Sequence, residues 1–140
     1  LRELGHSDLE AAKSKLDDLT YRRVRHIITE NDRVLATVAA LRAGQIDKIG
    51  PIFEASHVSM RDDFEISIPE LDLAVETALK TGAIASRMTG GGFGGAAIAV
   101  INKDLLTGLE VAVRAAIAQA GFGAANVFTV SASAGANREG

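Results

Sequence analysis

The chain has 140 residues, of which 47% are hydrophobic and 24% are charged, as in an ordinary globular domain. Its net charge of −3 and its few aromatic residues argue against nucleic acid as a partner, and no apolar run reaches the roughly 18 residues of a membrane span. The lack of cysteine excludes disulfides and thiolate metal sites and is compatible with a cytoplasmic location. We therefore expect a single domain, residues 1–140, with neither a nucleic acid nor a membrane as partner.

The first part of the chain is expected to be helical. A capping box at Ser7 and Glu10 indicates a short helix near the N-terminus. The first long helix is expected over residues 21–43, with Thr20 as its N-cap and Gly44 at its end. Helical spacing places one set of apolar side chains on the inner face of this helix: Val24, Ile27, Ile28, Leu35, Val38 and Leu41.

Two further helices follow. The second is expected over residues 46–60 and is followed by a polar turn at 61–65. The third begins near Ser67, has Pro69 in its first turn, where proline is favoured, and ends at Gly82. The apolar spacing predicts that the third helix packs inward through one set of residues: Leu71, Ala74, Val75, Ala78 and Leu79.

The C-terminal part contains the strand signals. Strands are expected at residues 83–88 and 96–101, and their closeness in sequence predicts antiparallel pairing. A fourth helix is capped by Asn102 or Asp104, and a last strand is expected at 126–131. Four main helices and three strands predict an α+β fold, in which helices cover a small antiparallel sheet.

The segment between the first two strands, residues 90–95, is the glycine loop. Five of its six residues are glycine, although glycine costs roughly 0.5–1 kcal/mol relative to alanine in regular structure. Gly90, Gly92 and Gly95 have the spacing of the dinucleotide fingerprint, but that motif opens a helix, and here an apolar strand follows. The phosphate-loop motif is also excluded, since no lysine follows the glycines.

Two interpretations of the glycine loop remain open. One is a tight glycine-rich hairpin, and the other is a nest of backbone N–H groups that faces an anion or supports such a nest. In the second interpretation Thr89 adds a hydroxyl donor and Arg87 adds a positive charge.

The other charged clusters are interpreted as ordinary surface. The basic run at residues 22–26 is expected to be a solvated helix face, and the acidic residues at 30–32 are expected to be helix-surface charge. Ser56 and His57 are adjacent, and adjacent helical residues point apart, so they do not form a nucleophile–base pair. The aspartates at 62–63 lack a further metal ligand at a known spacing, so a turn is expected there.

Three ordered blocks resemble one family, the galactokinases. Residues 21–34 resemble a helix of the C-terminal half of these enzymes. Residues 56–72, which begin with Ser-His and continue through Pro-Glu, resemble a second segment of the family. Residues 87–95 are similar to the third motif of the GHMP sugar and metabolite kinases, in its galactokinase form. A fainter similarity lies at 133–136, where Ala132 replaces the usual preceding proline.

The resemblance implies the C-terminal domain of a galactokinase, with a ferredoxin-like small antiparallel sheet covered by helices. It implies a cytoplasmic enzyme that transfers the γ-phosphoryl group of ATP to the C1 hydroxyl of D-galactose, with Mg²⁺. The family's galactose-recognition motif, phosphate loop and catalytic Arg and Asp are missing from the chain. The implied partner is therefore an N-terminal domain that carries them, and the fragment alone is expected to be inactive, with no catalytic residue of its own.

The resemblance also assigns a role to the glycine loop and its flanks, as one wall of the active cleft on the nucleotide or substrate side. This wall consists of Arg87, Thr89, Gly90, Gly91, Gly92, Phe93, Gly94 and Gly95. Two alternatives remain, a non-catalytic relative that senses sugar and ATP, and a GHMP kinase for another substrate. The phosphate-loop sequence of the missing half would test the first. The two helical blocks argue against the second, because the glycine motif is shared more widely.

Overall fold

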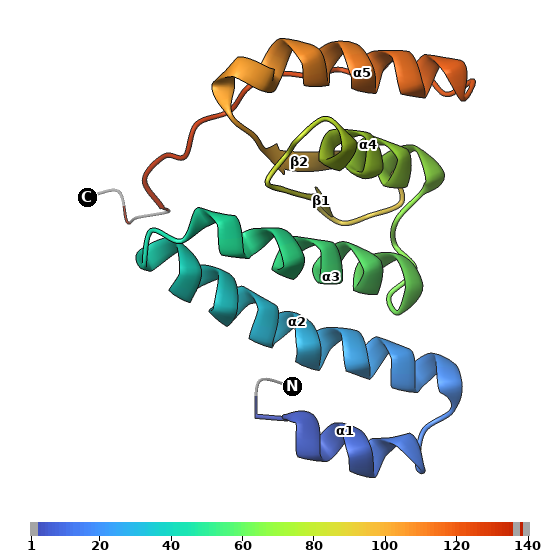
Figure 1. Ribbon diagram of the computed structural model, residues 1–140. Helices are drawn as coiled ribbons and strands as arrows, with labels where there is room; N and C mark the ends of the chain where they lie inside the picture. Colours follow the sequence, from blue (N-terminus) through green and yellow to red (C-terminus); the bar gives the residue numbers. More distant parts are fainter. Residues whose placement is uncertain (1–2, 136–137, 139–140) are drawn as a thin grey trace.

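A computed structural model describes residues 3–135 and 138 (Figure 1). The last residue of the 133–136 segment lies outside the described residues. Within them, no helix combines the length and the apolar character that a bilayer crossing requires. The elements, in chain order, are α1 His6–Lys13, α2 Asp18–Arg42, the 3₁₀ helix η1 Ile46–Lys48, α3 Ile49–Asp62, α4 Pro69–Lys80, β1 Ala85–Thr89, β2 Ala96–Val100, the 3₁₀ helix η2 Lys103–Leu105 and α5 Leu106–Gln119.

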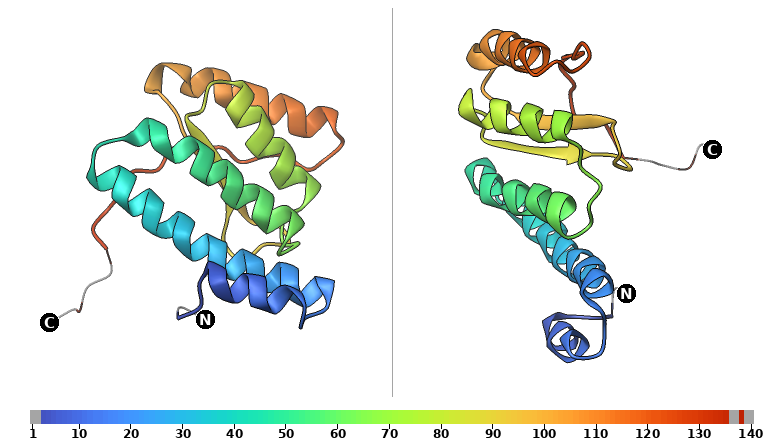
Figure 2. Two further views of the ribbon diagram at one scale, coloured as in Figure 1. Left: turned by 60° about the horizontal axis from the view of Figure 1, so that its bottom comes forward. Right: turned by 90° about the vertical axis from the view of Figure 1, so that its right-hand side faces the viewer.

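The elements form a stack. Helix α1 packs on α2, α2 packs on α3, and α3 lies along β1 (Figure 1). On the other side, α4 covers the two strands, and α5 packs on α4 (Figure 2). Strand β1 is therefore enclosed between α3 and α4, which explains why it is mostly buried although its sequence includes polar residues, whereas β2 is more exposed.

The helix starts differ from the predicted caps. The N–H of Gly5 donates to the carboxylate of Asp8 at 2.8 Å, so Gly5 is the N-cap of α1 and Ser7 lies inside the helix. In α2 the carboxylate of Asp17 accepts from the N–H and the hydroxyl of Thr20, at 3.0 and 2.7 Å. The predicted capping roles of Ser7 and Thr20 are therefore wrong, because an aspartate at each helix start satisfies the free N–H group.

The helix ends agree better with the sequence. Gly44 and Gly82 follow α2 and α4 with φ of +68° and +98°, the left-handed conformation in which helices commonly end. Pro69 is the first residue of α4, where its missing N–H costs nothing. The predicted second helix divides into η1 and α3.

The core consists of three clusters. The largest joins α4 to α5, the second joins α2, α3 and β1, and the third joins α3, α4 and β1. Ile28 of α2 is buried, but Leu35, Val38 and Leu41 are 61%, 39% and 49% exposed. Their predicted inward orientation is wrong within this chain, because the remaining elements cover only part of α2. The buried members of the three clusters are Ala78, Leu109, Val113 and Ile117; Ala40, Ile49 and Ala85; and Met60, Leu71 and Met88.

The predicted hairpin is confirmed. Strands β1 and β2 pair antiparallel, with Ala85 opposite Val100 and Thr89 opposite Ala96. Helix α3 approaches β1 so closely that a Cβ on Gly50 would lie 2.5 Å from the carbonyl oxygen of Ile84. Glycine at position 50 is therefore required for α3 to pack on the sheet.

The predicted third strand at residues 126–131 is wrong. In the described residues the sheet has two strands, and residues 122–135 belong to no helix or strand. Val127 packs against the α4–α5 cluster, whereas Phe128 and Val130 are 73% and 71% exposed. An alternating pattern favours a strand only where the segment pairs with a sheet edge, and in the described residues β1 and β2 pair only with each other. The predicted α+β class is confirmed.

Candidate functional site

The glycine loop joins β1 to β2 and lies beside the connection from α3 to α4, residues 63–68 (Figure 1). Four of its five glycines have positive φ, between +84° and +126°. Phe93 is also left-handed, with φ of +57°. The loop therefore follows a path that residues with a side chain rarely adopt, which accounts for most of its glycines.

The glycine loop contacts the rest of the described chain through its middle. The N–H of Phe93 donates to the carbonyl oxygen of Ile66 at 2.8 Å. A Cβ on Gly92 would lie 2.5 Å from Ile66 Cβ and 2.6 Å from the Ile66 oxygen. Glycine at position 92 is therefore required by the chain itself, as the hairpin interpretation expects.

The remainder of the glycine loop is open. A Cβ at Gly90, Gly91 or Gly94 would meet no atom within 4 Å. Within the described residues, the N–H groups of these three glycines and of Gly92 donate no backbone hydrogen bond, unlike that of Phe93. The Phe93 side chain is 78% exposed. The hairpin interpretation thus holds for the packed middle of the loop, whereas the anion interpretation stays open for the flanks.

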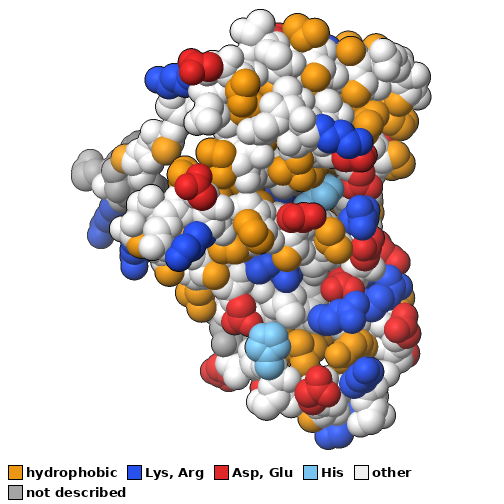
Figure 3. All heavy atoms as spheres, in the orientation of Figure 1, with side chains coloured by type: hydrophobic (Ala, Val, Ile, Leu, Met, Phe, Trp, Pro, Cys, Tyr) orange, Lys and Arg blue, Asp and Glu red, His pale blue; other side chains and the backbone are white. Residues whose placement is uncertain are grey.

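The basic run on α2 is not a solvated face, and that prediction is wrong. Arg22 and Arg23 both bind the carboxylate of Glu65, and Arg25 binds the carboxylate of Asp63. These pairs join α2 to the α3–α4 connection, where basic and acidic side chains alternate along the right-hand edge of Figure 3. Hydrogen bonds from Arg23 and Arg22 hold the pKa of Glu65 below its usual value.

Beneath these pairs lies His26, which is buried. Its ring stacks on Phe64, with 4.6 Å between the centroids, and its Nδ1 lies 3.0 Å from Ser59 Oγ. Burial lowers the pKa of His26, so the ring is neutral and acts as part of the core. The α3–α4 connection is thus fixed to α2 by packing as well as by charge.

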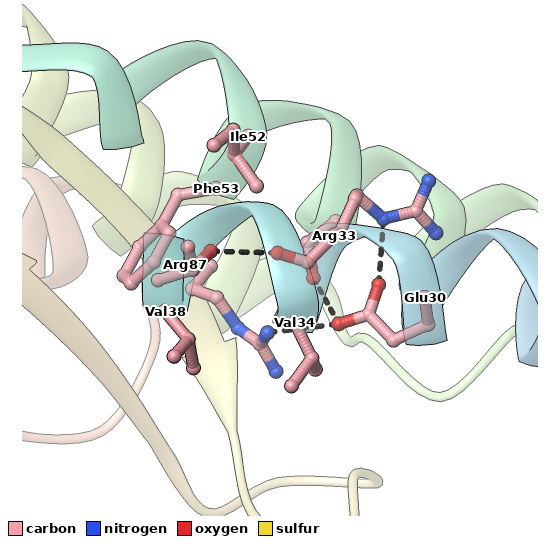
Figure 4. Close-up of a pocket in the computed structure, with 9 residues that line it drawn as sticks. Glu30, Arg33, Val34, Val38, Ile52, Phe53 and Arg87 are labelled. Atoms are coloured by element: carbon pink, nitrogen blue, oxygen red, sulfur yellow. Dashed lines mark hydrogen bonds and ion pairs between the residues drawn. The ribbon is translucent and has the colours of Figure 1, made fainter. Parts of the chain in front are cut away.

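Glu30 is the centre of a second cluster, and its predicted surface position is wrong. Its carboxylate accepts from Arg87 at 2.9 Å, from Arg33 at 2.7 Å and from Ser56 at 2.6 Å (Figure 4). Burial opposes its ionisation, but the hydrogen bonds from Ser56 and Arg33 and the positive charges of Arg33 and Arg87 outweigh it and lower the pKa of Glu30.

The position of Arg87 differs from the sequence interpretation. Its guanidinium lies between Glu30 and the Phe53 ring, on the side of β1 that faces α2 and α3. Beside it, Val34, Val38 and Phe53 line a small cavity of about 190 Å³ (Figure 4). The structure therefore brings Arg87 to Glu30 and not to the open side of the glycine loop. Thr89 ends β1, directly before the glycines.

His57 secures the same end of β1. Its Nδ1 accepts from the N–H of Met88 at 3.3 Å, and its Nε2 lies 3.2 Å from Asp72 Oδ1. Burial lowers the pKa of His57, which keeps Nδ1 free of a proton and able to accept. Ser56, by contrast, donates to Glu30. Ser56 and His57 thus have different partners, as adjacent helical residues that point apart should, and no pattern in the sequence indicated that His57 accepts from Met88.

The described part of the chain contains no group of residues that could hold a metal ion. Within residues 3–135 and 138, no three His, Asp or Glu side chains lie close enough together to hold a metal ion. Asp63, one of the two aspartates considered above, is occupied by Arg25. These residues therefore do not fit a Mg²⁺ site.

Comparison with known proteins places this geometry in a family. The family described as GHMP kinases C terminal matches residues 37–119. A galactokinase of Streptomyces coelicolor is 47% identical over 99% of this chain, and one of Mycobacterium tuberculosis H37Rv is 43% identical over 87%. The chain spans only 36% and 34% of the length of these two relatives.

A solved structure agrees. The galactokinase of Lactococcus lactis, crystallised with galactose, superposes on 89% of this chain with a TM-score of 0.82 and 36% sequence identity. This chain corresponds to 33% of that one. Since the family match alone covers more than half of the 140 residues, the chain belongs to the family of GHMP kinase C-terminal domains.

Proposed function

We propose that this chain is the C-terminal part of a galactokinase, an enzyme that transfers the γ-phosphoryl group of ATP to the C1 hydroxyl of D-galactose. The observation that carries the proposal is the 47% identity to a galactokinase over 99% of this chain. The chain spans about a third of the length of such relatives, and we take residues 1–140 as one domain of a longer protein. An N-terminal domain of the same protein supplies the catalytic groups, and the enzyme is cytoplasmic.

In this proposal the glycine loop is one wall of the cleft between the two domains. Phosphoryl transfer depends mainly on positioning and on the stabilisation of phosphate charge. In the described residues the N–H groups of Gly90, Gly91 and Gly94 donate no backbone hydrogen bond, and successive backbone N–H groups in turns make concave sites for anions. Phe93, which is 78% exposed, lies on the side of the cleft that the N-terminal domain covers.

Arg87 and Thr89 have different roles in this wall. Arg87 is bound to Glu30, so it holds β1 against α2 and does not meet the phosphates directly. Thr89 lies at the strand end next to Gly90, where its hydroxyl extends the row of donors. Mg²⁺ would neutralise phosphate charge, but its ligands lie outside this chain, whose described residues include no suitable set.

The test is galactose-dependent ATP turnover by the full-length protein, with the product identified by phosphorus NMR. We expect galactose 1-phosphate and ADP in equal amounts from the full-length protein, and no turnover from the 140-residue chain alone. A full-length protein that binds both ligands but forms no sugar phosphate would contradict the proposal and favour the sensor. Turnover by the chain alone would contradict the assignment of the catalytic groups to the N-terminal domain.

A further inference from the structure

Two left-handed residues lie at one hydrogen bond: Phe93 is its donor, and Glu65 directly precedes its acceptor, Ile66. In the described part of the chain, Glu65 and Phe93 are the two non-glycine residues with positive φ, and each has φ of +57°. Between them, the carbonyl oxygen of Ile66 accepts from the Phe93 N–H at 2.8 Å. Strained backbone persists only where surrounding contacts determine it, so both positions require a stabilising cause.

For Glu65 the cause is its side chain. One carboxylate oxygen accepts from Arg22 Nη1 at 2.7 Å, and the other accepts from Arg23 Nη2. The same two arginines also donate to backbone carbonyl oxygens of the preceding turn, those of Asp62 and Asp63. The turn is therefore held at its backbone and at its carboxylate by one turn of α2.

The fixed turn determines where Ile66 lies. The N–H of Ile66 donates to Met60 at the end of α3, and its carbonyl oxygen faces the glycine loop. Gly92 approaches this residue so closely that no Cβ fits. A shift of Glu65 would therefore move the surface on which the middle of the glycine loop rests.

We propose that Glu65, held by Arg22 and Arg23, is a positioning residue for the glycine loop. It acts through Ile66 on the loop backbone and does not touch substrate. This role rests on the proposed function, in which the glycine loop shapes the kinase cleft. It also assigns a purpose to the basic run on α2, whose first residue, Arg22, lies 43 residues before Glu65.

An ordinary surface ion pair provides the contrast. Glu76 and Lys80 form an exposed pair within α4, four residues apart. Such pairs contribute little to stability and fix no distant backbone. Glu65 differs because its carboxylate joins two arginines of another helix and because its own backbone is left-handed. Loss of Glu65 is therefore expected to change the glycine loop, whereas loss of Glu76 is not.

The experiment compares full-length wild type with Glu65→Ala, Glu65→Gly and the control Glu76→Gln. Glu65→Gly removes the carboxylate but accepts the left-handed backbone, so it remains usable if Glu65→Ala fails to fold. Hydrogen exchange of the Phe93 amide is measured without substrate, and kcat and KM are measured well below the melting temperature. We expect exchange to rise and kcat to fall, each by roughly tenfold, in both Glu65 variants, with wild-type values in Glu76→Gln.

Two outcomes would overturn the proposal. One is a lowered melting temperature in the Glu65 variants with unchanged Phe93 exchange, which would make the pair a stabilising contact only. The other is raised exchange with unchanged kcat and KM, which would separate the loop from turnover. Because exchange needs no turnover, a wild-type protein without kinase activity would refute the proposed function and still leave the positioning of the loop decided by the first measurement.

Discussion

The middle and the flanks of the glycine loop contain the same residue type for different reasons. Gly92 lies against Ile66, where no side chain fits, whereas Gly90 and Gly94 have open space and need glycine for their positive φ. Gly91 has neither constraint, since its φ is not in the left-handed range and a Cβ at this position would meet no atom within 4 Å. The other glycines of the loop are therefore required by contacts or backbone conformation within this chain, whereas any requirement for Gly91 comes from outside it.

The largest effect is expected at the packed middle. In the full-length protein, Gly92→Val should lower the free energy of unfolding by roughly 2–5 kcal/mol, since left-handed backbone costs about 1–2 kcal/mol and overpacking adds about 1–3 kcal/mol. Urea unfolding measures it. If stability is unchanged, the close approach between Gly92 and Ile66 is not a feature of the folded protein.

The open flank should respond less. Gly90→Ala meets no atom within 4 Å, so we expect only the backbone penalty of about 1–2 kcal/mol in unfolding free energy. Gly90→Asn should lose less, because asparagine tolerates the left-handed conformation. A loss in Gly90→Ala as large as that in Gly92→Val would remove the distinction between middle and flank.

The stability of strand β1, which leads into the glycine loop, should depend on pH through His57. Burial holds the pKa of His57 below its ordinary value of 6.5, so the unfolded chain takes up a proton that the folded chain does not. Stability is therefore full above pH 6.5 and falls as the pH drops toward the lower folded pKa; His26 acts in the same direction. Urea unfolding between about pH 7.5 and about pH 5.5 should show this decline, with a smaller slope in His57→Gln. Equal slopes in the two proteins would mean that His57 is not the group that titrates.

The smallest effect on stability is expected at Gly91. Gly91→Ala should change the free energy of unfolding by no more than about 0.5 kcal/mol, because nothing in this chain contacts that position. The kcat and KM of Gly91→Ala are measured as well. A rise in KM for ATP with unchanged stability would show that a ligand approaches Gly91. A strong loss of stability in the full-length protein would instead identify the N-terminal domain as the neighbour.

Local patterns predicted the helices and the hairpin because these depend on residues close in sequence. Helical spacing, Pro69 and the terminal glycines determine where α4 and its neighbours begin and end. The short connection between β1 and β2 determines their antiparallel pairing. The misplaced caps have the same local origin, since Asp17 and Thr20 are both favoured at helix starts and only the hydrogen bonds distinguish them.

What the sequence could not predict is pairing at long range. Arg22 selects Glu65 across 43 residues and Arg87 selects Glu30 across 57, and no spacing rule connects such positions. The strand expected at 126–131 failed for a related reason, because its partner edge is a property of the whole fold. The signal for the α2 contacts would have been the two acidic residues between α3 and α4, Asp63 and Glu65, together with the basic run on α2. This signal does not indicate which arginine binds which carboxylate.

In the proposed galactokinase, the packed middle of the glycine loop sets the geometry needed for phosphoryl transfer. The most direct measurement is kcat for galactose phosphorylation by full-length Gly92→Ala relative to wild type, at a temperature where both are fully folded. We expect a loss in kcat of roughly tenfold or more, since small displacements at such sites are costly. A Gly92→Ala enzyme that is folded and turns over at the wild-type rate would contradict it.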